Sequence, residues 1–180
     1  VISMATGGLI IGVSLGLMAG YFGKRIDSII MRTGELFASF PDIFLVIILA
    51  ATLGPRVRDW VRWIEDHTFL DGLVRSGAPD YTVVSLALVA FGWIGMARLV
   101  RGQVLMLKET EHVQAARAIG ASTSRILFRH LLPNAISPIV VLVSMGMGVL
   151  IGTEIILSFL GIGIQPPRPS LGTMLREAAN

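Results

Sequence analysis

The chain has 180 residues, of which 53% are hydrophobic and 15% are charged, whereas an average soluble domain is roughly 25% charged. The charges are clustered, since none falls within residues 1–23, 81–97 or 131–153. This pattern excludes an ordinary soluble domain, and a sequence without cysteine excludes a disulfide framework and a thiolate metal site.

The N-terminal block lacks the basic n-region and the small-residue cleavage site of a secretory signal. The chain begins at Val1 and stops within a helical pattern, so we expect a segment of a longer protein. Because about 20 apolar helical residues cross a bilayer, four spans are predicted, at about residues 1–22, 36–54, 81–103 and 134–160.

The first span carries a glycine at every fourth position, which places all of them on one helix face. A bare glycine face allows another helix to approach closely in lipid. We therefore predict that this face packs against a second helix, through Gly8, Gly12, Gly16 and Gly20.

The segments between the spans are assigned to the two sides of the membrane by their Lys and Arg residues. Residues 21–35, interpreted as a short polar turn with an amphipathic piece, and 98–130 hold nine, against six on the other side. This bias places a loop at 104–133 in the cytoplasm. The mixed loop at 55–80 and the tail at 161–180, in which Ser170 is expected to cap a short helix, are placed outside.

The cytoplasmic loop contains two predicted helices, within the sequence EHVQAARAIGASTSRILFRHLLPN at residues 111–134. The first has Val113 and Ala116 on one side and ends at Gly120. The second, at 123–131, is capped by Ser122, and Pro133 begins the next span. A DNA-binding helix-turn-helix has a similar outline, but lipid lies too close for the second helix to enter a groove. A solvated loop needs no alanine pair, so a docking element for a cytoplasmic partner is favoured.

The spacing of Ala115, Ala116, Gly120, Leu132 and Pro133 resembles the EAA loop of ABC-type importer permeases. Gln114 and His130 stand where that family often has Glu and Ile. Residues 19–32 and 158–175 are similar to the peptide/nickel branch, particularly the C-type permeases of dipeptide and oligopeptide systems. The resemblance implies an all-α, polytopic transmembrane helical bundle of the type I importer class with a MetI-like core, in a prokaryotic plasma (inner) membrane.

The same resemblance implies the partners, the function and the coupling residues. The partners are a second homologous permease, two cytoplasmic ATP-binding subunits and an extracytoplasmic substrate-binding protein, in a lipid bilayer and without nucleic acid. The expected function is ATP-driven import of di- or oligopeptides. The alternatives are nickel or another small solute as substrate and, less favoured, an ATP-independent carrier. The residues expected to couple transport to the ATPase are Gln114, Ala115, Ala116, Arg117, Gly120, Ala121, Leu132 and Pro133.

Catalysis is not expected of the chain itself, since no phosphate-binding G-x-x-x-x-G-K-[ST] motif occurs in it. No cofactor is expected, and no second ligand at a suitable spacing makes His130 a metal site. Glu154 is the one ionisable residue deep in the fourth apolar stretch. It is interpreted as a pathway residue or, more simply, as a structural hydrogen-bonding group. An intramembrane enzyme with Asp42 and Glu154 as an acid pair remains the weaker alternative.

Overall fold

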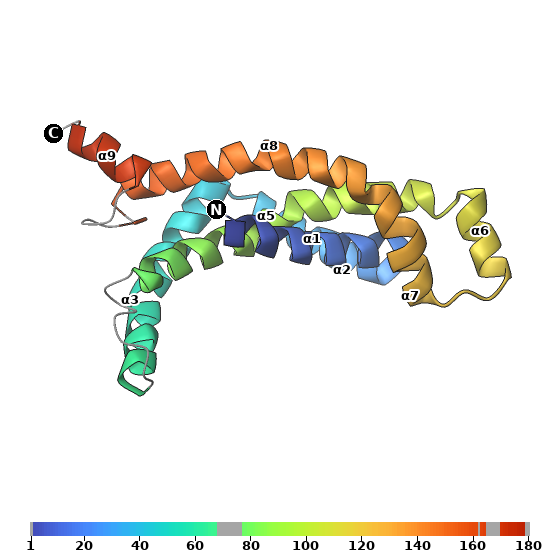
Figure 1. The fold of residues 1–180 in the computed structure, drawn as a ribbon, viewed down its shortest axis with the longest axis horizontal. Coiled ribbons are helices and arrows are strands. Elements are labelled where there is room, and N and C mark those ends of the chain that lie inside the picture. Colours follow the sequence, from blue (N-terminus) through green and yellow to red (C-terminus); the bar gives the residue numbers. More distant parts are fainter. Residues whose placement is uncertain (1, 68–76, 162, 165–169, 179–180) are drawn as a thin grey trace. The chain divides into compact units, whose positions relative to one another are not determined.

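The computed structural model describes residues 2–67, 77–161, 163–164 and 170–178, and all regular structure in these ranges is helical. The expected all-α fold class is confirmed. The elements in chain order are α1 (Ile2–Phe22), α2 (Lys24–Ala38), α3 (Asp42–His67), α5 (Ala78–Leu107), α6 (Glu111–Ala118), α7 (Thr123–Arg125), the π-helix η1 (Ile126–Leu131), α8 (Leu132–Phe159) and α9 (Leu171–Ala178) (Figure 1).

Two stretches of helix within the described residues are long and apolar enough to cross a membrane. They are Ala78–Leu107 and Thr123–Phe159, and the second combines α7, η1 and α8. A third arises if α2 and α3 are counted together as one broken span, and Gly8–Phe22 is a shorter apolar helix. The limits of the predicted spans and their sidedness stay predictions.

The described residues form two compact units, which share α5 and α8. Unit 1 comprises Val1–Met4, Phe40–Phe91 and Met147–Asn180, and unit 2 comprises Ala5–Ser39 and Gly92–Gly146. Unit 2 contains most of the predicted functional residues. Its main core gathers side chains from α1, α5, α6, η1 and α8, namely Leu17, Met96, Val100, Val104, Val113, Ile126, Leu131, Ala135 and Ile139.

In unit 2 the glycine face of α1 lies directly against α5. A Cβ atom added at Gly12 would lie 2.6 Å from the Cβ of Met96, and one added at Gly16 would lie 2.7 Å from the Cβ of Val100. These separations are too short for non-bonded carbon atoms. A Cβ atom added at Gly20 would likewise lie 2.7 Å from the Cβ of Val104, whereas one added at Gly8 would make an ordinary contact of 3.6 Å with the backbone of Gly92. Each glycine therefore faces a residue 84 positions later, which means that α1 and α5 run parallel.

The helix α2 doubles back beside α1 and α5, as Figure 1 shows. The reversal occurs at Gly23, whose φ of 61° is accessible to glycine at little cost. The side chain of Asp27 then contacts Arg101 of α5. A Cβ atom added at Gly34 would lie 3.2 Å from the Cγ2 of Ile94. The short polar turn expected at 21–35 is confined to Gly23, and the expected amphipathic piece is the helix α2, which packs on α5.

Unit 1 joins α3 to the first turns of α5 and the last turns of α8. Its core consists of Val46, Val84, Ala87, Leu88 and Leu157. The carboxylate of Asp80 accepts a hydrogen bond of 2.9 Å from the guanidinium of Arg58. In α9 the hydroxyl of Ser170 accepts a hydrogen bond of 3.1 Å from the N–H of Thr173, which confirms the expected cap.

Two segments are more helical than the sequence suggests. Residues 55–67 continue α3 although a loop is expected there, and residues 68–76 lie outside the described ranges. The pattern of Val57, Trp60, Val61 and Ile64 has helical spacing, which accounts for the continuation. The fourth apolar stretch is also unbroken until Gly161, where φ is 79°.

The helix α8 continues through Pro133 and Pro138 without interruption. The π-helix η1 ends at Leu131, two residues before Pro133. A π turn shifts the register of the backbone hydrogen bonds, and proline has no N–H to donate to them. The side-chain amide of Asn134 donates to the carbonyl of His130 at 2.6 Å, so that this acceptor is also satisfied. The chain can thus pass a proline without ending the helix.

The close contact of α1 and α5 makes a direct prediction for Gly16→Ala. The added methyl group meets the carbonyl oxygen of Ala97 at 2.7 Å, so the helices must separate. We expect the free energy of unfolding to fall by about 1–3 kcal/mol, the usual cost of overpacking. Thermal unfolding of the purified protein in detergent measures it.

Gly95→Ala is the matched control, because an added Cβ at Gly95 meets nothing within 4 Å. In a helix this change is expected to be neutral or stabilising by up to about 1 kcal/mol. Equal stabilities for the two variants would contradict the packing role of the glycine face.

Candidate functional site

The hairpin, defined here as residues 108–131, projects from the end of unit 2 and contains α6, α7 and η1 (Figure 1). One face of α6 is fixed in the core, since Val113 is fully buried and Ala116 is 6% exposed. They contact a core that also contains Ile126 and Leu131. These two residues come from η1, which with α7 forms the second arm of the hairpin. The hairpin is therefore held by apolar contacts between its own arms and to α1 and α5.

The turn of the hairpin has the hydrogen bonds of a Schellman motif. The N–H of Gly120 donates to the carbonyl of Arg117 at 2.9 Å, and the N–H of Ala121 donates to that of Ala116 at 3.0 Å. Gly120 has a φ of 80°, and its added Cβ would meet nothing within 4 Å. Glycine is thus required here by backbone conformation and not by space, and the expected end of the first helix is confirmed.

The second arm begins as expected but does not end as expected. The hydroxyl of Ser122 accepts a hydrogen bond of 3.4 Å from the N–H of Arg125, so Ser122 is the predicted cap. A separate helix that stops at 131 is wrong, because α7, η1 and α8 follow one another without interruption from Thr123 to Phe159. The second arm of the hairpin and the apolar span that follows it therefore form one continuous helix.

The predicted coupling residues do not share one surface. Gln114, Ala115, Arg117 and Gly120 are exposed, Ala116 is buried, and Ala121 and Leu132 are half-buried. Pro133 is exposed. The two alanines of the pair differ, since Ala115 is exposed and Ala116 is buried in the core of its own unit. The coupling role of the whole set stays a prediction.

Two of the polar coupling residues are engaged within the chain. The side-chain amide of Gln114 donates to the carbonyl of Glu109 at 2.9 Å, which closes the start of α6. The guanidinium carbon of Arg117 lies 5.2 Å from the centre of the Tyr21 ring, a cation–π distance. Arg117 thus connects the hairpin to the end of α1.

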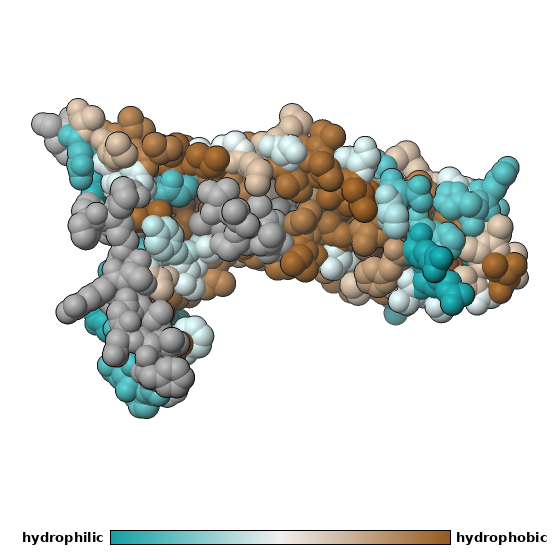
Figure 2. Space-filling model, in the orientation of Figure 1, coloured by the Kyte–Doolittle hydropathy of each residue, from teal (hydrophilic) through white to brown (hydrophobic). Residues whose placement is uncertain are grey.

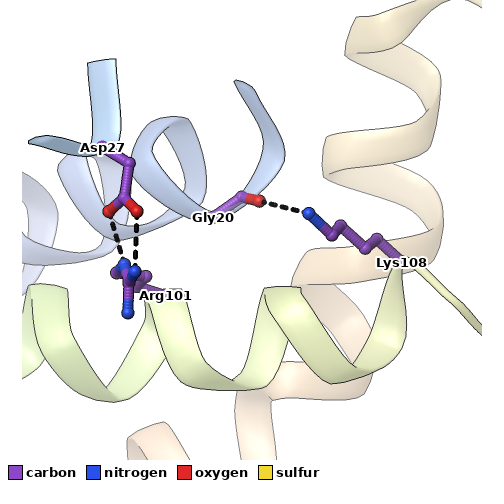
Figure 3. Close-up of polar contacts among 4 residues, drawn as sticks. All are labelled: Gly20, Asp27, Arg101 and Lys108. Atoms are coloured by element: carbon purple, nitrogen blue, oxygen red, sulfur yellow. Dashed lines mark hydrogen bonds and ion pairs between the residues drawn. The ribbon is translucent and has the colours of Figure 1, made fainter. Parts of the chain in front are cut away.

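Two further cations from α5 and its C-terminal end hold the corner between α1 and α2, as Figure 3 shows. The guanidinium of Arg101 makes a bidentate contact with the carboxylate of Asp27, one bond of which measures 2.6 Å. The ammonium of Lys108 donates to the carbonyl of Gly20 at 3.4 Å. This carbonyl lies in the last turn of α1, where acceptors lack helical partners and cations are favoured.

Sequence reasoning missed the contacts of Asp27, Arg101, Lys108 and Tyr21. A usable signal was present, since Arg101 is a charged residue inside a predicted span and such residues are normally paired. The sequence does not identify the partner, because Asp27 is 74 positions away and is brought near only by the reversal at Gly23.

Glu154 lies in unit 1, is half-buried and accepts a hydrogen bond of 2.7 Å from the hydroxyl of Ser158. That hydroxyl also accepts a bond of 3.1 Å from the N–H of Ile164. The side chain of Asp42 lies outside what the structure describes, and His130 has its ring centre 6.3 Å from that of His112. Among the described residues no group of three His, Cys, Asp or Glu is arranged to hold a metal ion.

Comparison with known families decides the identity of this helical arrangement. Residues 12–179 match the family model described as binding-protein-dependent transport system inner membrane component. The chain belongs to this family. The expected family and its location in the inner membrane are thereby confirmed, and the hairpin is a feature of an inner membrane component with apolar helices able to cross the bilayer.

Curated relatives of this inner membrane component are transport permeases. The chain is 40% identical to the glutathione transport system permease protein GsiD of Pectobacterium atrosepticum, over 98% of this chain and 53% of that protein. It is 37% identical to the dipeptide transport system permease protein DppC of Alkalihalophilus pseudofirmus, over 96% of this chain and 49% of that protein. It is 38% identical to the oligopeptide transport system permease protein OppC of Bacillus subtilis, over 94% of this chain and 48% of that protein. The chain thus spans about half the length of the curated relatives it matches.

The turn of the hairpin yields a prediction for Gly120→Ala. An alanine at this positive φ costs roughly 1–2 kcal/mol, so the cap should open more often. We expect the backbone amides of residues 120 and 121 to exchange with solvent several-fold faster in the variant, as measured by hydrogen exchange. Gly120→Asn should exchange at an intermediate rate, because asparagine tolerates this conformation better.

Gly102→Ala is a suitable control for that experiment, since it adds the same methyl group inside α5 where an added Cβ meets nothing within 4 Å. If both alanine variants change the exchange of the turn equally, the conformational requirement at Gly120 is refuted.

The contact between Asp27 and Arg101 predicts a measurable coupling energy. The two side chains are 19% and 34% exposed, so removing one charge leaves the other partly desolvated. In a double-mutant cycle with Asp27→Asn and Arg101→Gln we expect a coupling energy of about 1–3 kcal/mol. Chemical unfolding of the protein in detergent provides the four stabilities.

The control cycle uses Asp59 and Arg62, which approach only to 4.0 Å and have side chains that are 77% and 64% exposed. Such a surface pair is expected to couple by less than about 0.5 kcal/mol. A value for Asp27 and Arg101 no larger than this would show that their contact does not hold α2 on α5.

Proposed function

We propose that the chain forms part of a permease subunit that imports di- or oligopeptides with the energy of ATP, and that its hairpin couples the membrane helices to a cytoplasmic ATPase. The observation that carries the proposal is an exposed apolar residue at the tip of a hydrophilic projection. Ile119 is 87% exposed, although hydrophilic residues gather over the end of unit 2 that carries α6 (Figure 2).

The surface offered to the ATPase is one face of α6. Ala115 and Ile119 are four residues apart and therefore lie on the same side of the helix, opposite the buried Val113. A small alanine next to a protruding isoleucine is suited to insertion into a cleft. An exposed apolar side chain that becomes buried in such a contact contributes favourably to binding.

The mechanical argument rests on the continuity of the second arm. An ATPase that closes on ATP can displace the tip only if it binds one position of the hairpin better than another. Since α7, η1 and α8 form one continuous helix, a displacement of the tip must tilt or twist the beginning of α8. Rigid-body movement of this kind between packed states is a common form of switching.

The remaining partners are proposed from the family and from the names of the relatives. A binding-protein-dependent system needs a substrate-binding protein, and we propose a second permease and two ATP-binding subunits as the other components. Two of the named relatives are described as dipeptide and oligopeptide permeases and a third as a glutathione permease. These names support a short peptide as the substrate of this chain.

The docking face is tested by site-specific crosslinking in the assembled importer. We expect Ala115→Cys and Ile119→Cys to form crosslinks to an ATP-binding subunit, because both positions are exposed on one face of α6. The matched control is Ala116→Cys, which should crosslink poorly because its side chain is buried in unit 2. Crosslinks from all three positions alike, or from none, would contradict the docking face.

Substitutions at Ala115 and Ala116 distinguish a loss of docking from a loss of stability, when uptake and thermal stability are measured together. Ala115→Leu is expected to leave thermal stability unchanged but to lower ATP-driven peptide uptake. Ala116→Leu is expected to lower the stability itself, by about 1–3 kcal/mol through overpacking. Normal uptake by Ala115→Leu and by Ile119→Asp together would refute the coupling role.

A further inference from the structure

The helix α2 has three distinct faces, of which only one is occupied within the described chain. The first face packs on α5 through Asp27, Ile30 and Gly34. The second is apolar and exposed, and its large side chains are Ile26, Ile29, Leu36 and Phe37. The third is polar and exposed, and it is called the polar stripe here; it consists of Ser28, Arg32, Glu35 and Ser39.

The polar stripe is a regular feature of the helix. Its residues are spaced four, three and four positions apart, which places them within a narrow sector of one helix face. All four are exposed, and Ser39 continues the stripe from the C-cap position, where its hydroxyl donates to the carbonyl of Glu35 at 2.8 Å. Neither Arg32 nor Glu35 forms an ion pair with another described residue.

The position of α2 along α5 places this stripe deep in the membrane. Gly34 lies against Ile94, which is 13 residues from the end of α5 at Leu107 and therefore about 20 Å along its axis. The part of α1 at this level, around Gly8 and Gly12, also faces the segment of α5 near Ile94 and belongs to a block without charges. Since a hydrocarbon core is about 30 Å thick, Arg32 and Glu35 leave α2 near the level of its interior.

Charged side chains at this depth cannot face lipid at low cost. A charge is costly at the centre of a bilayer, so such residues normally face water or a polar partner. The exposed apolar face of α2 offers the surface that hydrocarbon or an apolar helix would cover. The polar stripe, on a different side of the same helix, must then border an aqueous space.

We propose that the polar stripe lines the peptide passage, and that Arg32 and Glu35 bind the two charged ends of a zwitterionic peptide. This inference rests on the proposed function and adds residues that determine substrate specificity. The guanidinium of Arg32 is suited to a bidentate contact with the C-terminal carboxylate, and the carboxylate of Glu35 accepts hydrogen bonds from the N-terminal ammonium. The complementary charges of these neighbours fit a ligand with one charge of each sign.

The dimensions agree with a short peptide. Arg32 and Glu35 are three residues apart, so their Cα atoms differ by about 4.5 Å along the helix axis. Two peptide residues extend over at most about 7 Å. Two long side chains that diverge slightly can therefore reach both ends of a dipeptide, and a longer peptide would contact them with one end at a time.

The first test compares peptides with free and blocked ends, in the complete importer reconstituted with all its subunits. Arg32→Gln should lower kcat/KM for a free dipeptide roughly tenfold, the loss expected for one charge-assisted hydrogen bond, but leave uptake of its C-terminal amide unchanged. Glu35→Gln should show the same selectivity toward the N-terminally acetylated peptide. The matched control is Arg25→Gln, an exposed arginine on the same side of α2 but about 10 Å nearer the turn at Gly23.

The second test locates the aqueous space by cysteine labelling, which is straightforward because these 180 residues contain no cysteine. Ser28→Cys, Arg32→Cys and Glu35→Cys should react with a hydrophilic, membrane-impermeant thiol reagent, and the dipeptide should slow the reaction. Ile29→Cys and Leu36→Cys, on the exposed apolar face, should remain unlabelled.

The outcomes separate this inference from the proposed function. If the unmodified importer does not take up peptides with ATP, the proposed function fails. If it does, but Arg32→Gln and Glu35→Gln behave as Arg25→Gln does, the binding role is overturned. Equal effects on free and blocked peptides, labelling of both exposed faces, or labelling of neither would also overturn it, since the stripe would then contact another protein surface.

Discussion

The close contact between α1 and α5 is the interaction on which the rest of unit 2 depends. Glycine at every fourth position of α1 brings the two helices together along their length, with a constant offset of 84 residues. In lipid, where apolar surface gains little from leaving its surroundings, such close packing of small residues is a main source of helix association. Once this pair is fixed, the turn at Gly23 directs α2 back along α5.

The corner between α1 and α2 is then the place where polar contacts are made. Arg101, Lys108 and Arg117 each bring a positive charge to residues 20–27, through a carboxylate, a backbone carbonyl and an aromatic ring. These contacts are different in kind but have the same result. They connect the hairpin and the end of α5 to the α1–α2 corner, so that α6 is supported on the side opposite its exposed face.

The hairpin combines buried and exposed parts, as the proposed coupling role requires. Its inner face is buried, its turn has a glycine cap, and its second arm continues into α8. Its outer face presents alanine and isoleucine to the solvent. The hairpin lies within the residues that match the family of inner membrane transport components. The polar stripe of α2 is a separate surface within the same unit, for which we propose contact with the substrate.

The sequence by itself determined the features that depend on short-range pattern. The apolar blocks indicated a helical membrane protein, the spacing of Gly8 to Gly20 indicated one close-packing face, and Gly120, Ser122 and Ser170 marked helix ends that the structure confirms. Each of these follows from helix periodicity or backbone conformation within a few residues. The alanine pair was also visible, but the sequence did not reveal which alanine would face inward.

Only the tertiary structure decided the features that depend on contacts between distant segments. It paired Asp27 with Arg101, turned Ala116 toward the core and Ala115 away from it, and placed α2 against Ile94. It also joined the hairpin to α8 through a π-helix at Ile126–Leu131. The physical reason is the same in each case. A side chain's partner is set by which helices lie side by side, and in this chain that arrangement follows from the packing of α1 and α5.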